Sequence, residues 1–247
     1  MKDKTIKALI LAAGRGKRLG KIVEGQNKCM LKVFGRPLIE YSLDCAKELE
    51  EVSEIIIVVG YRAEDIINWY GNNYKGKRIK YVIQWEQRGV VDAIEVSAES
   101  LEGKDFMLML GDEFMFNPRH NLMVKNFFEY DLFGICGVIR VKDTNLISKT
   151  YTIDVDNDFN IKQLIEKPDK PFNDLMGTGN CIFKYDILSY IPSTPINKNR
   201  GEKELPDLIQ EAINNNCIIK YFPICDKYVN INSPKELKEI ESYFSHG

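Results

Sequence analysis

The sequence predicts an α/β fold with a mainly parallel, doubly wound sheet and a small strand-rich lobe. Three observations support this prediction. Strand-like apolar runs alternate with helical patterns through the first half of the chain, the first run (8–13) is apolar at every position, and the second half is rich in strands. A continuous apolar run is typical of a strand buried on both faces, as in a parallel sheet covered by helices.

The elements of the first half follow one another in βαβ order. The sequence predicts strands at 8–13, 54–60, 79–84 and 105–110, and helices at about 37–49, 63–70 and 90–101. Because parallel strands are joined by crossover helices, their carboxyl ends meet at one edge of the sheet. We therefore expect a Rossmann-like sheet that binds its ligand outside the carboxyl ends of these strands.

The second half carries strand-like stretches at 133–141, 149–155 and 161–165, followed by two more helices. The last helix is predicted to begin at Ser233-Pro234, because serine caps a helix and proline suits its first turn. The chain has 247 residues and no Pro- or Ser-rich linker. These properties predict a single domain over 1–247 whose two halves share one core.

Composition narrows the class of partner. Lys and Arg number 34 against 36 Asp and Glu, a formal net charge of -2, so no basic field exists to hold nucleic acid or an anionic membrane. No apolar stretch approaches the roughly 20 residues of a membrane helix. Met1-Lys2-Asp3-Lys4 leads into the first strand without a hydrophobic leader. We expect a cytoplasmic protein with small-molecule partners, and no nucleic acid or membrane among them.

The sulfur-containing residues point to the core rather than to a metal. The six cysteines form no Cys-x-x-Cys pair and the chain has two histidines, which disfavours a zinc site. Cys136 and Cys181 lie in strand-like apolar runs, where a thiol behaves as a small hydrophobe. Met107 and Met109 alternate within a predicted strand, so we expect both in the core.

A glycine-rich basic loop, Gly14-Arg15-Gly16-Lys17-Arg18-Leu19, follows the first strand, and Lys28 comes soon after. Glycines let the backbone turn sharply and bring its N–H groups close to an anion, and the cations add charge. Walker A is excluded because Arg18 stands where Ser or Thr is required. The dinucleotide fingerprint is excluded because Leu19 replaces its third glycine and Gly60-Tyr61 its acidic residue. The loop predicts phosphate binding; a solvated turn is the alternative.

Acidic residues follow the strand at 105–110. Asp112 and Glu113 are predicted at the ligand-binding edge, where a carboxylate facing a phosphate loop suits Mg²⁺; a helix-capping role is the alternative. Glu166-Lys167-Pro168 places an acceptor and a cation at another strand end. Arg200 stands at the entry of a helix, where it is placed to bind a phosphate or to remain solvated.

The segment Asp154-Val155-Asp156-Asn157-Asp158 contains two Asp-x-Asp patterns of the kind that bind metal in glycosyltransferases. A turn is the preferred interpretation, because Asp and Asn cluster there between two strand-like runs.

Taken in order, these motifs resemble the nucleotidyltransferases that activate sugar phosphates, a family that includes glucose-1-phosphate thymidylyltransferases and uridylyltransferases. The most specific part of the resemblance lies at 11–19, 28–31 and 35–39. Weaker agreement continues along the chain at Gln84 with Gly89, Leu110-Gly111-Asp112, Glu166-Lys167-Pro168, Gly179 and Arg200-Gly201-Glu202.

The resemblance implies roles for these positions. Arg18, Lys28 and Asp112 would be catalytic, with Arg18 and Lys28 on the triphosphate. Further nucleotide-binding positions would be Leu11, Ala12, Ala13, Gly14, Arg15, Gly16, Lys17, Gln84 (for the base), Gly89 and Asp112. The acceptor would be held by Glu166, Lys167, Gly179 and Arg200. Mg²⁺ would be held by Asp112 and Asn230, with Glu113 as a further candidate ligand.

The implied activity is transfer of a nucleotidyl group from a nucleoside triphosphate, with a pyrimidine base favoured, to a sugar 1-phosphate with release of pyrophosphate. The division would be a nucleotide-binding half (about 1–130), an acceptor-binding lobe (131–232) and a C-terminal helix (233–245). The oligomeric state, a homo-oligomer included, is left open.

The chain departs from the family pattern at three places. Asn230 stands where members commonly carry a second metal-binding Asp, Asn27 replaces a usual Pro, and Val90-Val91-Asp92 replaces smaller residues. These departures keep two alternatives open: a cytidylyltransferase acting on a non-sugar phosphate or phosphonate, and a nucleotide-binding regulatory subunit without transfer activity. A glycosyltransferase that uses Asp154 and Asp156 is a further alternative, which rests on the Asp-x-Asp patterns.

Overall fold

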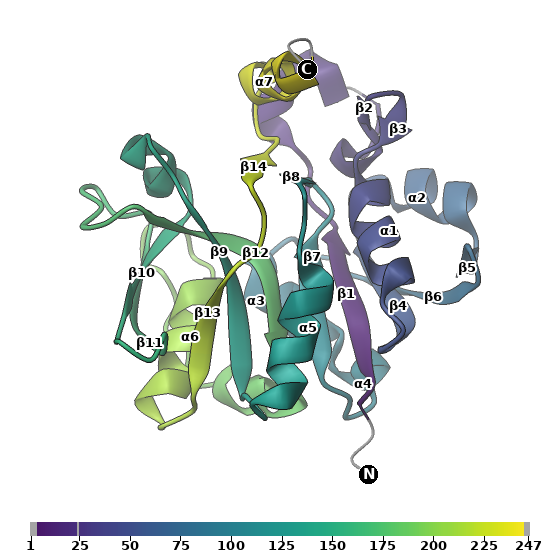
Figure 1. The fold of residues 1–247 in the computed structure, drawn as a ribbon. Coiled ribbons are helices and arrows are strands. Elements are labelled where there is room, and N and C mark those ends of the chain that lie inside the picture. The colour runs from purple at the N-terminus through teal and green to yellow at the C-terminus, as the bar shows by residue number, and fades with distance from the viewer. Residues whose placement is uncertain (1–3, 24, 245–247) are drawn as a thin grey trace.

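Parallel strands form one half of the central sheet in the computed structural model, which describes residues 4–23 and 25–244. They lie in the order β7 (Phe106–Leu110), β1 (Ile6–Ala12), β4 (Val52–Val59) and β6 (Lys77–Ile83) (Figure 1). Ile10 of β1 aligns with Ile57 of β4 on one side and with Met109 of β7 on the other. The short strand β5 (Asn73–Tyr74) pairs with β6 at the end of this half.

The strand-rich lobe continues the same sheet rather than forming a separate one. β12 (Leu175–Phe183) runs antiparallel to β7 and joins it to β10 (Tyr151–Val155), which pairs with β11 (Ile161–Glu166). β9 (Gly134–Arg140) also pairs with β12, and β13 (Ile219–Pro223) pairs with β9. The predicted α/β class with a large, mostly parallel sheet is confirmed.

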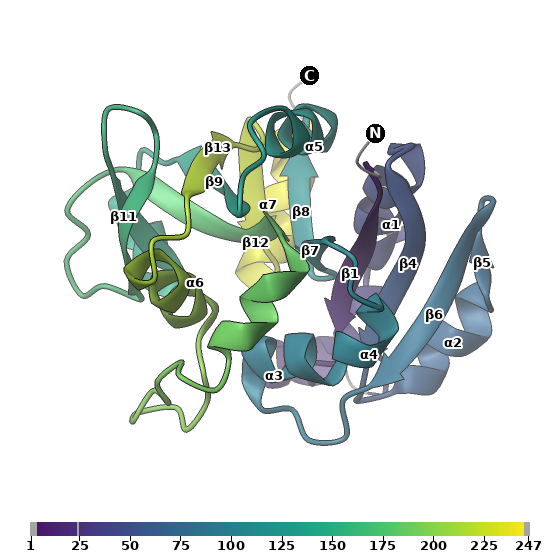
Figure 2. The ribbon, with the colours of Figure 1, turned by 90° about the horizontal axis from the view of Figure 1, so that it is seen from below.

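Helices cover both faces of the sheet (Figure 2). On one face lie α1 (Ile39–Glu48), α2 (Ala63–Tyr70) and α5 (His120–Glu129); on the other lie α3 (Gly89–Val96), α4 (Ala98–Leu101) and α6 (Leu205–Asn214). Short 3₁₀ turns span Lys17–Val23, Lys28–Met30, Thr144–Lys149 and Tyr185–Tyr190. Within residues 4–23 and 25–244, no helix is both long enough and apolar enough to cross a bilayer.

The predicted elements and the structure differ in several places. The helix expected at 90–101 is two helices, α3 and α4, joined at Ser97, whose hydroxyl donates to the carbonyl of Ala93 (2.8 Å). The strand β8 (Glu113–Phe116) and the helix α5 were not predicted. The last helix, α7 (Pro234–Phe244), begins one residue after the expected Ser233, and position 245 lies outside the described residues.

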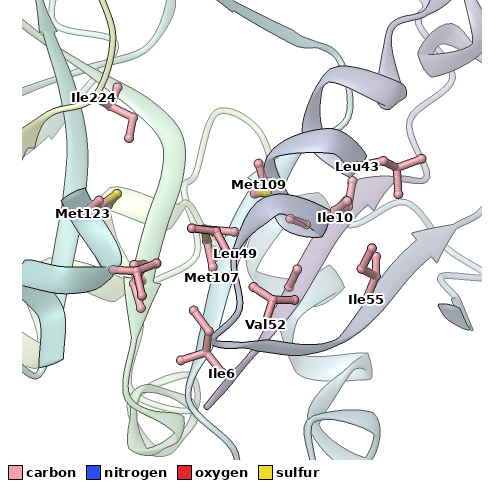
Figure 3. Packing of buried hydrophobic residues seen from close by; sticks show 14 of the residues in the cluster. Ile6, Ile10, Leu43, Leu49, Val52, Ile55, Met107, Met109, Met123 and Ile224 are labelled. Carbon is pink, nitrogen blue, oxygen red and sulfur yellow. The ribbon is translucent and has the colours of Figure 1, made fainter. Parts of the chain in front are cut away.

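The core lies on both sides of β1, because alternate residues of this strand enter different hydrophobic clusters. Ile6 and Ile10 pack under α1 with residues of both halves of the chain, as Figure 3 shows for Met109, Met123 and Ile224. Leu9 and Leu11 face α3 and α6 on the other side. Met107, Met109, Cys136 and Cys181 are buried, as predicted.

Lys7 interrupts the apolar pattern of β1. It is 4% exposed, and its Nζ donates to the carbonyl oxygen of Ser100 (2.8 Å). The same ammonium pairs with Glu54 (3.1 Å) and Glu102 (2.8 Å). The charge is therefore fully paired at the amino end of the strand, as a buried cation must be.

A third apolar cluster supports the carboxyl edge of the parallel strands. It joins Leu19 and Leu31 from the start of the chain, Phe114 from its middle, and Ile231 and Ile240 from near its end. Two small sheets lie here, β2 (Lys32–Val33) with β3 (Arg36–Pro37) and β8 with β14 (Lys227–Asn230). Figure 1 shows α7 and β14 beside the segment that follows β1.

Candidate active site

A cavity of about 450 Å³ opens at the carboxyl ends of β1 and β7. Most of the predicted site residues line it: Leu11, Ala12, Ala13, Gly14, Gly16, Arg18, Lys28, Gln84, Gly89, Asp112, Glu113, Glu166, Lys167, Gly179, Arg200 and Asn230. Residues from β1, β6, β7, β11, β12 and β14 or from the loops after them meet in this one space. The parallel sheet thus presents its strand ends to a common ligand-binding volume.

Asn27 fixes the segments on either side of the glycine loop by hydrogen bonds. This side chain is completely buried, and its Nδ2 donates to the carbonyl oxygens of Ala12 (3.0 Å) and Tyr61 (2.7 Å). Its Oδ1 accepts from the backbone N–H of Cys29 (2.8 Å). Asn27 therefore joins the end of β1 to the turn that presents Lys28, a role the proline usual at this position has no side-chain groups to perform.

Gly16 is required by close packing as well as by its backbone. Its φ is +60°, and a Cβ there would lie 3.1 Å from the Cβ of Lys28. The loop therefore lies directly against the stem of this lysine, whose ammonium pairs with Asp112. The glycine loop and Lys28 thus lie together beside the carboxylate of Asp112, which comes from the end of β7.

Asn232 organises the cations of this site. Its Oδ1 accepts from Arg18 (3.0 Å) and from Lys28 (3.0 Å), and its Nδ2 donates to Oδ1 of Asn230 (2.7 Å). Its backbone N–H donates to Glu236 of α7 (2.7 Å). Sequence reasoning missed Asn232, because a residue more than 200 positions from the phosphate loop gives no local sign of such a contact.

The oxygen donors near Lys28 fit a magnesium ion. Asp112 and Asn230 both line the cavity, and Asn230 pairs with Glu113, the residue that follows Asp112. Mg²⁺ prefers carboxylate and amide oxygens such as theirs as ligands. Among residues 4–23 and 25–244, no cluster of three or more His, Cys, Asp or Glu is placed to hold a metal. An ion bound here would complete its shell with phosphate oxygens and water.

Glu113 is engaged by protein donors. Its Oε1 accepts from the backbone N–H of Gly179 (3.0 Å) and from the hydroxyl of Tyr228, and its Oε2 accepts from Nδ2 of Asn180 (2.5 Å). The side chain is buried, and this burial raises the pKa of Glu113 to about 8. These contacts favour a role in fixing Gly179 over the predicted metal-binding one.

A second, smaller cavity of about 200 Å³ lies behind Glu113. Asn180 passes the hydrogen-bond chain on to it, since its Oδ1 lies 2.8 Å from Nε2 of His120. Asn180 uses its Nδ2 on Glu113, so His120 must donate from Nε2, and burial lowers the pKa of His120, consistent with the neutral ring. Polar contacts thus run unbroken from Tyr228 to His120.

Cations and carboxylates lie together where Glu166, Lys167 and Arg200 line the cavity; this region, where the resemblance implies that the acceptor binds, is called the acceptor end below. Lys167 pairs with Glu166 (2.7 Å), and Arg200 pairs with Glu204 (2.8 Å) and with Glu202. Burial raises the pKa of Glu166 and that of Glu204, because fewer water molecules stabilise their charged forms. The two cations are held by internal partners until an anionic ligand competes for them.

The opposite end presents an amide. Gln84 is 4% exposed, and its Nε2 donates to Asp92 (2.7 Å) and to the carbonyl oxygen of Gly89 (3.1 Å). Both amide hydrogens are therefore used within the protein, so the Oε1 of Gln84 is the atom left to accept from a ligand. Asp92, one of the departures from the family pattern, sets this orientation.

Some predicted residues lie elsewhere. Arg15 donates to Gln87 (3.1 Å) and does not line the cavity. The side chain of Lys17 lies outside the described part of the chain, so its role stays a prediction. Asp154 and Asp156 lie away from the cavity, and Asp156 accepts from the backbone of Asp158 and Asn160 (both 2.9 Å), as the predicted turn requires. Asp154 and Asp156 are therefore not part of the cavity that the other predicted site residues line.

Comparison with known proteins shows the family to which the chain is related. The family model described as nucleotidyl transferase matches residues 7–226. The UTP–glucose-1-phosphate uridylyltransferase AglF of Haloferax volcanii is 33% identical over 237 residues, 96% of this chain and 95% of that protein. The bifunctional protein GlmU of Methanocaldococcus jannaschii is 27% identical over 96% of this chain, which spans about half (53%) of that relative's length.

Solved structures share the fold. The crystal structure of a UDP-glucose pyrophosphorylase complexed with UDP-glucose superposes with a TM-score of 0.87 at 22% identity, over 98% of this chain and 100% of that one. A putative glucose-1-phosphate thymidylyltransferase from Bacillus anthracis gives a TM-score of 0.85 at 21% identity, over 96% and 94% of the two chains. Together with the match over residues 7–226, the sequence comparisons show that this chain belongs to the nucleotidyl transferase family.

Proposed function

We propose that the protein transfers a nucleotidyl group from UTP or dTTP to a sugar 1-phosphate and releases pyrophosphate. The observation that carries this proposal is one continuous cavity lined by two pairs of cations, Arg18 with Lys28 and Lys167 with Arg200. Two phosphate-binding groups in one space suit a reaction between two phosphorylated substrates. The similarity to a UTP–glucose-1-phosphate uridylyltransferase supports the same reaction class.

The triphosphate belongs at the glycine loop. There Arg18 and Lys28 share Asn232 as a neutral partner, and Lys28 also contacts Asp112. An amide acceptor positions the cations without cancelling their charge, so they remain able to bind phosphate oxygens. Bound Mg²⁺, held by Asp112 and Asn230, would neutralise further negative charge on the phosphates.

The base is recognised by Gln84. Because both amide hydrogens of Gln84 are used within the protein, its oxygen is the atom left to bind a base, and the site favours a base edge that offers an N–H donor. The N3–H of uracil or thymine is such a donor, whereas N3 of cytosine is an acceptor. This argument places UTP and dTTP ahead of CTP.

The chemical step needs no covalent enzyme intermediate. An oxygen of the acceptor phosphate attacks the α-phosphorus of the triphosphate, the new O–P bond forms, and the bond from the α-phosphorus to the bridging oxygen of the β-phosphate breaks. The electron pair leaves with pyrophosphate. Lys167 and Arg200 orient the attacking phosphate, and Arg18 and Lys28 stabilise charge on the transferring and leaving groups.

The test is pyrophosphate release measured with purified protein and Mg²⁺, using each of UTP, dTTP, CTP, ATP and GTP against a panel of phosphorylated acceptors. We expect release with UTP or dTTP and a hexose 1-phosphate, and none without acceptor. Release only with CTP and a non-sugar phosphate or phosphonate would instead establish the cytidylyltransferase alternative. Tight triphosphate binding without release for any acceptor would establish a regulatory subunit.

A further inference from the structure

One carboxylate of α7 bridges two segments that line the cavity. Oε1 of Glu236 accepts from Nζ of Lys149 (2.9 Å), and its Oε2 accepts from the backbone N–H of Asn232 (2.7 Å). Lys149 ends the 3₁₀ turn that precedes β10 in the strand-rich lobe, whereas Asn232 lies between β14 and α7. Lys149 and Asn232 both line the cavity, so Glu236 connects two of its walls from behind.

The Asn232 end of this bridge holds the cations of the glycine-loop side. Oδ1 of Asn232 accepts from Arg18 and from Lys28, and its Nδ2 donates to Asn230. All of these contacts come from one amide group, so their geometry depends on where the backbone of Asn232 lies. That backbone belongs to the short connection between β14 and α7, outside the strand pairing, and Glu236 holds its N–H.

The Lys149 end of the bridge belongs to the strand-rich lobe. The next residue, Thr150, accepts at its carbonyl oxygen from the backbone N–H of Lys167 (2.6 Å), a cation of the acceptor end. The described members of the apolar cluster under α7 come from 19–41, 114 and 229–240. Since none of these described members comes from 134–223, this cluster does not tie α7 to the strand-rich lobe, and the pair of Lys149 with Glu236 does.

The exposure of the two side chains determines what their pair contributes. The side chain of Glu236 is 12% exposed and that of Lys149 is 59% exposed. An ion pair with so accessible an ammonium contributes little to the stability of the fold. Its loss would still free the Glu236 carboxylate to change its rotamer, and the backbone of Asn232 would lose a fixed acceptor. The pair is therefore suited to setting geometry rather than to stabilising the protein.

We infer that Glu236 is a positioning residue for the triphosphate: Lys149 holds its carboxylate, and the carboxylate fixes Asn232 and thereby the two cations that Asn232 binds. This inference rests on the proposed function. Misplacing a reacting or binding group by about 1 Å can cost about a hundredfold in rate, so a residue that touches no substrate can control the reaction.

Three variants remove the bridge one contact at a time. Lys149→Met removes the ammonium and leaves the contact of Glu236 with Asn232. Glu236→Gln has a similar effect, because its single amide oxygen can serve Asn232 while its NH₂ group cannot accept from Lys149. Glu236→Ala removes both contacts.

Steady-state kinetics of the full chain with Mg²⁺, UTP and glucose 1-phosphate measure the effects. We expect kcat/KM for UTP to fall by about tenfold in Lys149→Met and in Glu236→Gln, and by about a hundredfold in Glu236→Ala. Because the bridge acts on the triphosphate, KM for glucose 1-phosphate at saturating UTP should stay within about twofold of wild type in Lys149→Met and in Glu236→Gln.

A matched control separates positioning from stability. Lys184→Met breaks the pair of Lys184 with Asp131 (3.0 Å), and neither residue lines the cavity. The urea midpoint of Lys149→Met and that of Lys184→Met should both equal that of wild type, because neither pair adds much stability. Only Lys149→Met should change kcat/KM for UTP.

The double variant Lys149→Met with Glu236→Gln distinguishes action through Glu236 from direct contact of Lys149 with substrate. If Lys149 acts through Glu236, the double variant should be no slower than either single variant. A further loss of about tenfold in the double variant would show that Lys149 binds substrate itself, and would overturn the inference. This comparison does not need Glu236→Ala, which decides nothing if it fails to fold.

The failures of the two proposals are distinguishable. If wild type transfers to glucose 1-phosphate and both Lys149→Met and Glu236→Gln keep kcat/KM for UTP within about twofold, the positioning role is wrong and the transferase activity stands. If wild type releases no pyrophosphate with any triphosphate and any phosphorylated acceptor, the proposed function is wrong and this inference with it.

Discussion

At the residue scale, the part of the cavity lined by Arg18, Lys28 and Asn232 shows how a neutral side chain positions charged ones. Asn232 takes one hydrogen bond from Arg18 and one from Lys28, and Asp112 is the carboxylate that contacts Lys28. A carboxylate at position 232 would pair more strongly with these cations and compete with an anionic ligand. The neutral amide of Asn232 thus leaves both cations more available to such a ligand.

The first prediction concerns these charged groups. Asp112→Asn and Arg18→Ala should each lower the rate of pyrophosphate release by at least about a hundredfold, because each removes a group that positions or stabilises charge on the phosphates. Steady-state kinetics with UTP and glucose 1-phosphate measure the loss. Lys47→Ala is the control, since Lys47 is an exposed residue of α1 that does not line the cavity, and it should retain activity within a few-fold. Near-normal rates for both site variants would contradict the assignment.

The second prediction concerns the buried carboxyl of Glu113. Its folded pKa of about 8 lies above its ordinary value of 4.5, so between these pH values the folded state holds a proton that the unfolded state has lost. The free energy of unfolding should therefore fall as pH rises from about 5 to 8, by at most about 1.4 kcal/mol per pH unit for this one proton.

Urea denaturation of wild type and Glu113→Gln at several pH values between 5 and 9 tests this. The difference in unfolding free energy between the variant and wild type should grow in favour of the variant up to pH 8 and then level off. Glu129→Gln, which replaces an exposed side chain at the end of α5, is the matched control. Parallel pH profiles for wild type and Glu113→Gln would show that Glu113 is ionised in the folded protein throughout.

At the element scale, β12 connects the parallel half of the sheet to the strand-rich lobe. Its glycines leave room for side chains of the neighbouring strands to pack against it. Other side chains fill the space beside Gly177 and Gly179, and Gly179 also donates its backbone N–H to Glu113. The strand therefore serves as both the floor of the acceptor end and the anchor of a buried polar chain.

The third prediction compares two cavity-lining glycines. Gly179→Ala should destabilise the fold by about 1–3 kcal/mol, because the added methyl group would overlap Leu110 and crowd Glu113. Gly14→Ala should change stability by less than about 0.5 kcal/mol, since no atom lies within 4 Å of the added methyl group and φ is not positive. Thermal and urea unfolding measure both. Equal stability of the two variants would contradict the packing described for β12.

The elements also show what sequence patterns can predict. Long apolar runs such as 8–13 predicted the parallel strands because burial on both faces leaves a continuous signal. The short strand β8 carries no such signal in four residues, and α5 has no capping side chain at its start. Ser97 divides the helix predicted at 90–101 because its hydroxyl bonds back to the carbonyl of Ala93, a competition that composition does not reveal.

The candidate site divides in the same way. Motif residues such as Gly16 and Asp112 were found because each comes soon after a strand that ends at the same edge of the sheet, and Lys28 was found because it comes soon after the glycine loop. Tyr228 and Asn232 were not found, because their contacts depend on β14 pairing with β8 and on the C-terminal segment packing against the start of the chain. Such pairings follow from the assembled fold and leave no local pattern.

At the scale of the whole molecule, the two halves share their hydrophobic clusters. Ile10 and Met107 of the first half pack in one cluster with Met176 and Ile224 of the second. Because both halves contribute residues to the same buried cluster, neither half should stay folded when the other unfolds.

The fourth prediction follows from this shared core. Unfolding by urea should be one transition with the same midpoint by tryptophan fluorescence, which reports Trp69 and Trp85 in the first half, and by far-ultraviolet circular dichroism, which reports all helices and strands. UTP with Mg²⁺, at about 100 times its dissociation constant, should raise the free energy of unfolding by about 2.7 kcal/mol. The increase should be the same whether fluorescence or circular dichroism is used to follow unfolding. Separate midpoints, or a shift in one signal alone, would show two independent units.

The burial of β1 on both faces has a consequence for how the chain finds its alignment. A slip of β1 by one residue against β4 and β7 would exchange its two faces, yet both faces would still be apolar, so burial alone does not choose between the two alignments. The ammonium of Lys7 makes the choice, because a slip would carry it away from Ser100, Glu54 and Glu102 and leave an unpaired charge in the interior. The glycine loop follows β1 directly, so this ion cluster at the far end of the strand also fixes where that loop begins.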